Sequence, residues 1–191
     1  MIKDYLNIED LKKEVVNAIN NQTVIFIKSL FNKTPSWNQF IQLIDYAESK
    51  DYVSSNIRND AMGFGGNMYL RIADVFNPIT GKNAENIMPE LDFVVDFFNN
   101  IFDHKSIYSE AYLNFKSNIS KTEPHNDDWI AVAWGCEGVT EWQIYNDYFS
   151  DKNKEKYDSY MMNPGDIIII PKGVVHCVVP QEPRASISLA Y

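Results

Sequence analysis

The sequence predicts a mainly β fold, an antiparallel barrel or jelly roll with N-terminal α-helices packed on its outside. After residue 105 the chain consists of short β-branched and aromatic runs, separated by Gly, Pro, Asn and Asp at roughly 8–12-residue intervals. Before that point, apolar residues recur at helical spacing. A length of 191 residues with 45% hydrophobic content suits one domain with a sizeable core. We therefore expect a single domain over residues 1–191, with a helical or mixed part in 1–105 and the barrel strands in 106–191.

The first fifty residues predict two helices and a strand. Residues 8–20 carry apolar positions on a period of three to four with one charged face, which favours an amphipathic helix. Residues 23–28, "TVIFIK", are β-branched and aromatic and favour a strand. Residues 34–50 predict a helix, with Thr34 as its N-cap and Pro35 in its first turn.

The next fifty residues predict one strand and one long helix. "GFGGN" at 63–67 is typical of a turn, and residues 68–76 favour a strand. Residues 83–104 form a strongly apolar helix candidate, in which Pro89 marks a break or a start.

The barrel itself is expected in seven short runs. They are "SEAYLNFKSNI" (109–119), "DWIAVAWG" (128–135), "TEWQIYN" (140–146), "DSYMMN" (158–163), "DIIIIP" (166–171), "VVHCVV" (174–179) and "ASISLAY" (185–191). The charged segment 146–159 is long for a hairpin, so we expect a surface loop near the substrate entrance.

Composition argues against several classes of protein. The net charge of −9 disfavours nucleic acid as the main partner, because binding to phosphate backbones depends on Lys and Arg. No apolar run approaches the ~18 residues of a membrane span, and the N-terminus lacks a signal peptide. Cys136 and Cys177 form no disulfide framework and are expected to be small buried side chains. A cytoplasmic location is therefore predicted.

The stretch "EPHNDDW" at 123–129 carries the first functional signal. His125 and Asp127 are two residues apart, so on an extended strand both side chains project from one face. An imidazole and a carboxylate are two of the three ligands of a 2-His-1-carboxylate metal site. The third ligand would be one of the other two histidines, His104 or His176. Asp128 would face the other way.

The segment around His176 resembles the second motif of the cupin superfamily. That motif has a glycine, a proline, a second glycine and a histidine at fixed spacing, which Gly165, Pro171, Gly173 and His176 reproduce. The family usually has Asn four residues after the histidine, where this chain has Pro180.

The resemblance narrows to the JmjC-type, cupin-like Fe(II)/2-oxoglutarate oxygenases over roughly residues 108–191. These proteins carry His-x-Asp, then a strand with Gly, Trp and Tyr, then Pro-Gly-Asp before the distal histidine. Gly138, Trp142 and Tyr145 match the middle pattern. The resemblance implies a double-stranded β-helix, with His125, Asp127 and His176 as catalytic Fe(II) ligands. It also implies that Thr122, three residues before the first ligand, hydrogen-bonds the 2-oxoglutarate carboxylate.

One position departs from this pattern. The family holds the distal carboxylate of 2-oxoglutarate with a Lys or Arg, and Thr140 stands there in this chain. A buried carboxylate needs a cation, and the Arg fork suits it best. Arg184, at the start of the last strand and on one face with Ser186, is the expected substitute. Lys172 and Arg71 are less suitable alternatives.

The expected function is therefore Fe(II)- and 2-oxoglutarate-dependent hydroxylation of a protein side chain, an amino acid or another small molecule, with 2-oxoglutarate converted to succinate. Thr140 keeps open a metal-dependent cupin enzyme that does not use 2-oxoglutarate. A non-catalytic ligand-binding cupin is the third possibility. A small-molecule, protein or peptide substrate is the expected partner, no membrane is involved, and a homodimer is possible for such folds.

Overall fold

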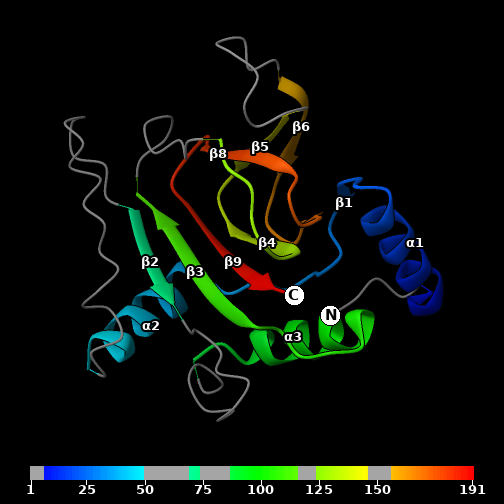
Figure 1. The fold of residues 1–191 in the computed structure, drawn as a ribbon. Coiled ribbons are helices and arrows are strands. Elements are labelled where there is room, and N and C mark those ends of the chain that lie inside the picture. Colours follow the sequence, from blue (N-terminus) through cyan, green and yellow to red (C-terminus); the bar gives the residue numbers. More distant parts are fainter. Residues whose placement is uncertain (1–6, 50–68, 74–86, 116–123, 146–155) are drawn as a thin grey trace.

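The fold is a mainly β barrel made of two antiparallel sheets, as the sequence predicts (Figure 1). The computed structural model describes residues 7–49, 69–73, 87–115, 124–145 and 156–191. One sheet has six strands in the order β1-β7-β4-β9-β3-β2, and the other has three in the order β6-β5-β8. The strands are β1 (Ile25–Ile27), β2 (Tyr69–Ala73), β3 (Tyr108–Asn114), β4 (Ala131–Glu137), β5 (Thr140–Tyr145), β6 (Lys156–Met162), β7 (Ile167–Ile170), β8 (Val175–Pro180) and β9 (Arg184–Ala190).

Within the described ranges, three helices lie at the periphery of the barrel: α1 (Ile8–Asn20), α2 (Trp37–Ser49) and α3 (Pro89–Phe102) (Figure 1). Helix α1 has the predicted bounds, and Asn7 caps it through a bond from the Glu9 N–H. Pro89 starts α3 rather than breaking it, because a proline is tolerated in the first turn, where its missing N–H costs nothing.

The prediction of Thr34 as the N-cap of α2 is wrong. The helix begins at Trp37, and the Ser36 carbonyl accepts the Phe40 N–H. The N–H and hydroxyl of Ser36 both donate to Gln39 Oε1, at 2.9 and 3.0 Å. Both bonds run from Ser36 to the side chain of Gln39, the third helical residue, which is one half of a capping box and places the start of the helix just after Ser36.

The outer face of the large sheet forms the main hydrophobic core. Alternate residues of its strands point outward and pack against the three helices. Trp134 of β4 lies against Phe31, with ring centroids 5.7 Å apart, and Phe31 in turn contacts Phe97 of α3 at 5.7 Å. Cys136 is fully buried in this core, as expected of a structural cysteine. The helices therefore cover only one side of the sheet and leave the barrel interior to the inward-facing residues.

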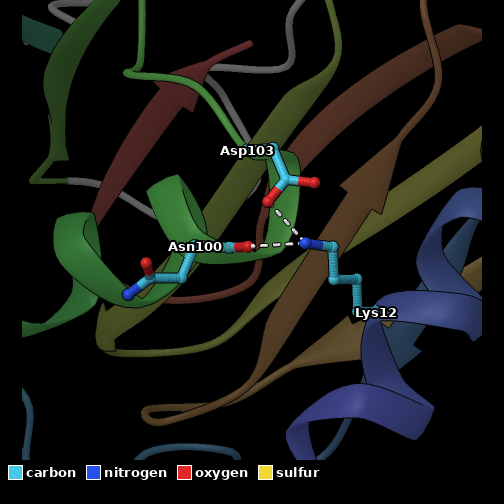
Figure 2. A network of polar contacts seen from close by, with 3 residues as sticks. All are labelled: Lys12, Asn100 and Asp103. Atoms are coloured by element: carbon cyan, nitrogen blue, oxygen red, sulfur yellow. Dashed lines mark hydrogen bonds and ion pairs between the residues drawn. The ribbon is translucent and has the colours of Figure 1, made fainter.

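A polar contact joins the first and third helices (Figure 2). The Lys12 ammonium of α1 lies 2.5 Å from Asp103 Oδ1 and 3.3 Å from the Asn100 carbonyl, at the C-terminal end of α3. A cation at the C-terminal end of a helix also interacts favourably with the helix dipole. Within the described residues, no helix is long and apolar enough to cross a membrane.

Asp166 ties the entry segment of the chain to the barrel. Its carboxylate accepts the N–H groups of Ser29, at 2.6 Å, and Asn163, at 2.8 Å, and it is almost completely buried. The preceding Gly165 has a positive φ of 89°, and a Cβ there would lie 2.3 Å from the Phe31 carbonyl oxygen. Glycine and aspartate are thus both required where the chain turns into β7.

Candidate metal centre

Two histidines and one aspartate meet at one end of the barrel. His125 forms an isolated β-bridge with His176 of β8, with N–H to carbonyl distances of 2.9 and 2.8 Å in the two directions. Their rings lie 4.4 Å apart, and His176 Nε2 is 3.6 Å from Asp127 Oδ2. One ligand atom from each of the three residues lies within 4.8 Å of the other two.

The backbone around Asp127 is held by the Pro-x-Gly corner before β8. The Gly173 N–H donates to the Asp127 carbonyl at 2.9 Å, and Gly173 has a φ of 84°. The bridge to His176 fixes one end of the His-x-Asp segment against β8, and the bond from Gly173 fixes the other end against the turn that precedes β8. The motifs are some fifty residues apart in sequence and become neighbours because of these bonds.

The ring of His176 is oriented for ligation. Its Nδ1 lies 3.1 Å from the Val174 carbonyl, so this nitrogen carries the proton and Nε2 presents its lone pair toward Asp127. Burial, and then the neighbouring charge of His125, lower the pKa of His176 to about 4. The imidazole is therefore neutral near pH 7, which is the form that binds a metal.

The three residues fit a divalent transition metal. Two imidazole nitrogens and one carboxylate oxygen on one side of a site leave other coordination positions open, an arrangement typical of non-haem Fe(II). Asp127 is partly exposed, while His176 is buried, so the site lies at the edge of the interior and can admit a ligand.

His104 and Asp128, the other residues near the motif or of ligand type, lie away from this cluster. His104 follows α3, and its ring lies near the aromatic rings of Phe102 and Tyr191. Asp128 is 93% exposed and lies 3.8 Å from Lys172, on the solvent side. His176 rather than His104 therefore joins His125 and Asp127, and Asp128 faces away as expected.

The barrel interior is divided into an apolar and a polar half. The apolar half is a cluster from β4, β5, β6, β7 and β8 that comprises Ala131, Ala133, Trp142, Ile144, Met162, Ile168, Ile170 and Val178. The polar half consists of buried side chains from the inward-facing positions of β3 and β9. They are Glu110, Asn114, Arg184 and Ser186. A charged or polar ligand inside the barrel would meet β3 and β9.

Arg184 and Ser186 share this inner face and contact one another. Arg184 Nη1 donates to Ser186 Oγ at 2.5 Å, and both residues are at least 96% buried. Across the ladder, Arg184 pairs with Asn114, and Ser186 pairs with Tyr112, whose hydroxyl donates to Glu110. Lys172 is largely exposed, so Arg184 is the better-placed cation of the two. Arg71 pairs in register with Tyr112, and its side chain lies outside the described part of the chain.

The polar residues of β3 were missed by sequence reasoning. "YSEAYLN" alternates polar and apolar residues, with Glu110, Tyr112 and Asn114 on one face and Ala111 and Leu113 on the other. This period of two is the signal that could have identified them. Without the barrel, however, the polar face of such a strand is expected to face solvent.

Thr140 and Arg184 lie at the same end of the barrel. The β4–β5 hairpin carries Gly138 and Thr140, and the β8–β9 hairpin leads into Arg184. A Cβ on Gly138 would lie 3.0 Å from the Arg184 Cα, and the Gln181 N–H donates to the Val139 carbonyl at 2.9 Å. Thr140 provides no cation at its own position, but the adjacent hairpin places the cation of Arg184 at the same end of the barrel. Thr122 lies outside the described residues.

The aromatic residues divide between the two sides of the barrel wall. Trp142 and Trp129 pack with the interior cluster, and the Trp142 ring lies 5.7 Å from that of His176. Trp134 belongs to the outer core, and Tyr145 packs with Val175 and Cys177 outside the interior cluster. Of these four residues, Trp142 borders the metal centre, while the Trp129 ring lies against Tyr108 at 5.1 Å.

Comparison with known proteins identifies the family. Residues 90–191 match the JmjC domain. No curated protein matches the sequence. Among solved structures, YcfD of Escherichia coli, a ribosomal oxygenase, superposes with a TM-score of 0.65 at 14% identity, over 100% of this chain and 53% of YcfD. Its complex with cobalt and 2-oxoglutarate gives a TM-score of 0.61 at 15% identity, over 88% of this chain and 48% of YcfD.

The likeness to YcfD concerns the fold, and this chain spans about half of the length of YcfD. A further complex of YcfD contains cobalt and succinic acid, with a TM-score of 0.63 at 14% identity over 92% of this chain and 50% of YcfD. Because the JmjC match covers residues 90–191, more than half of the chain and all of the barrel from β3 onward, the protein belongs to the JmjC-domain family.

Proposed function

We propose that the protein is an Fe(II)- and 2-oxoglutarate-dependent oxygenase that hydroxylates a side chain of a protein substrate. The observation that carries the proposal is the convergence of His125, Asp127 and His176 at the edge of a barrel whose interior holds a buried arginine. The JmjC family and the fold shared with YcfD support the oxygenase class, and the description of YcfD as a ribosomal oxygenase favours a protein over a free amino acid.

Each residue has a defined task in this proposal. His125, Asp127 and His176 hold Fe(II), which with 2-oxoglutarate and oxygen supplies the oxidising chemistry. The bond from His176 Nδ1 to the Val174 carbonyl keeps Nε2 directed at the metal position.

Arg184 is the proposed anchor of the distal carboxylate. Its guanidinium is buried on the inner face of β9 and reaches toward Ser186, whose hydroxyl is a second donor. Thr140 contributes a hydroxyl from the facing hairpin, and Thr122 is proposed to bind the carboxylate near the metal. The apolar half of the barrel excludes water from the space between the metal ligands and Arg184, and this strengthens each of these polar contacts.

Thr140 favours a second candidate, a metal-dependent cupin enzyme without 2-oxoglutarate. If Arg184 serves only to bind neighbouring side chains such as Ser186, no anchor for a dicarboxylate remains. The two candidates differ in one measurable property, the binding of 2-oxoglutarate to the Fe(II) form.

The test is anaerobic reconstitution with Fe(II), followed by addition of 2-oxoglutarate. The expected result is a visible metal-to-ligand charge-transfer band, absent in His176→Ala and retained in His104→Ala, which removes the histidine outside the site. Fe(II) binding without the band would support the second candidate. Loss of the band in both variants, or no Fe(II) binding in the wild type, would contradict the assignment of the ligands.

Location and assembly remain predictions from the sequence. A cytoplasmic protein that acts as a single domain, with the helices packed on the barrel, fits the proposal, and a homodimer is tested by measuring molar mass in solution.

A further inference from the structure

The indole of Trp142 lies inside the barrel next to the metal centre. Trp142 is on β5 between Thr140 and Ile144, and Ile144 pairs in register with His176. Its ring lies 5.7 Å from the His176 ring, tilted by 31°, and only 6% of the residue is exposed. Trp142 is therefore midway between the metal ligands and the end of the barrel where Thr140 and Arg184 meet.

The N–H group of this indole is buried without a hydrogen-bond acceptor. Among the described residues, Trp142 Nε1 has no partner, although buried polar groups are nearly always hydrogen-bonded. An unpaired buried donor destabilises the protein relative to an apolar group of the same shape. Such a group in a barrel that binds an anion is expected to find its acceptor on the ligand.

Trp134 provides an internal comparison. Its Nε1 is also buried and without a partner among the described residues, but this side chain lies on the outer face of β4 against Phe31. The two tryptophans thus share the same unpaired donor on opposite sides of the barrel wall. Only Trp142 faces the space where a ligand of the metal would extend.

The position of Trp142 indicates which ligand atom it serves. A 2-oxo dicarboxylate bound between the metal centre and Arg184 must pass Trp142, and all of its polar atoms are acceptors. Hydrogen bonds to carboxylate oxygens are stronger than those to neutral acceptors. Resting on the proposed function, we propose that Trp142 Nε1 donates a hydrogen bond to a carboxylate oxygen of 2-oxoglutarate and is a further cosubstrate-binding residue.

The test compares Trp142→Phe with Trp134→Phe in two measurements. Both changes keep an aromatic ring and remove one unpaired N–H. The first measurement is anaerobic titration of the Fe(II) protein with 2-oxoglutarate, followed by the charge-transfer band. Trp142→Phe should raise the Kd about 10- to 100-fold, the effect of one charge-assisted hydrogen bond, and Trp134→Phe should leave it unchanged.

The second measurement is urea unfolding of the metal-free proteins. Both changes put a smaller ring into a packed site, so each should lower the midpoint, and by similar amounts, because neither removes a hydrogen bond of the empty barrel. A purely structural role of the Trp142 ring would instead lower the midpoint of Trp142→Phe well below that of Trp134→Phe, together with the affinity for 2-oxoglutarate.

The outcomes separate the two proposals. Weaker binding in Trp142→Phe alone, with similar midpoints in the two variants, supports the inference. Equal 2-oxoglutarate binding by wild type and both variants refutes it and leaves the proposed function standing, as does weaker binding together with a midpoint well below that of Trp134→Phe. If the wild type itself binds no 2-oxoglutarate, the proposed function fails, and the inference fails with it.

Discussion

Replacement of Gly138 by Ala should destabilise the protein more than the same replacement at Gly173. Both glycines have a positive φ, 67° and 84°, so Ala carries a similar backbone cost at each position, about 1–2 kcal/mol. Part of that cost is offset by about 0.4–1 kcal/mol, because Ala restricts the unfolded chain more than Gly does. The backbone conformation alone therefore predicts nearly equal effects.

The space around the two positions is very different. A Cβ at Gly138 would lie 2.1 Å from the Pro183 carbonyl oxygen and 3.0 Å from the Arg184 Cα, whereas a Cβ at Gly173 would meet nothing within 4 Å. Backbone atoms cannot rotate away as a flexible side chain can, so the two hairpins must separate. Forcing this extra volume into a packed contact costs about 1–3 kcal/mol more at Gly138.

The assay is urea unfolding of both variants beside the wild type, with 2-oxoglutarate binding to the Fe(II) form as a second readout. Gly173→Ala should lose about 1 kcal/mol, and Gly138→Ala about 2–4 kcal/mol. Gly138→Ala should also bind 2-oxoglutarate more weakly, because the displaced hairpin carries Arg184. Equal losses of stability in the two variants would refute the close contact between the hairpins.

Three other predictions follow from the same contacts. Asp166→Ala should lose about 2–4 kcal/mol in urea unfolding, because two backbone N–H groups lose their bonds to a buried carboxylate, while the exposed Asp158→Ala stays within about 0.5 kcal/mol of the wild type. Because the pKa of His176 is lowered from 6.5 to about 4, the metal-free protein is most stable above about pH 6.5, where this imidazole is neutral in both the folded and the unfolded state. As the pH falls from about 6.5 to about 4, the unfolded chain binds a proton that the folded protein does not, so the free energy of unfolding falls by at most about 3 kcal/mol. Unfolding at several pH values should show this slope in the wild type and not in His176→Gln. Arg184→Gln should weaken 2-oxoglutarate binding at least about 10-fold in the anaerobic titration, and adding Thr140→Arg should recover part of it; equal binding by the wild type and Arg184→Gln would exclude Arg184 as the anchor.

Much of the fold was determined by local features of the sequence. The helix over residues 8–20 and the barrel strands were predictable because a period of three to four, or of two, follows directly from backbone geometry. The start of α2 was not, because Thr34 and Ser36 are both good caps, and only the contact between Ser36 and Gln39 selects one of them. The role of Pro89 was also ambiguous until α3 began there.

The sequence by itself determined which residue types are present for a metal site, and the motif spacing pointed to His125, Asp127 and His176. Only the tertiary structure decided that they meet, through the backbone bridge between His125 and His176. The structure also decided that Arg184 lies on the hairpin beside the one that carries Thr140, and that Glu110, Tyr112 and Asn114 face inward. The physical reason is the same in each case. Alternation along a strand sets which residues share a face, whereas closure of the barrel sets which face is the inside.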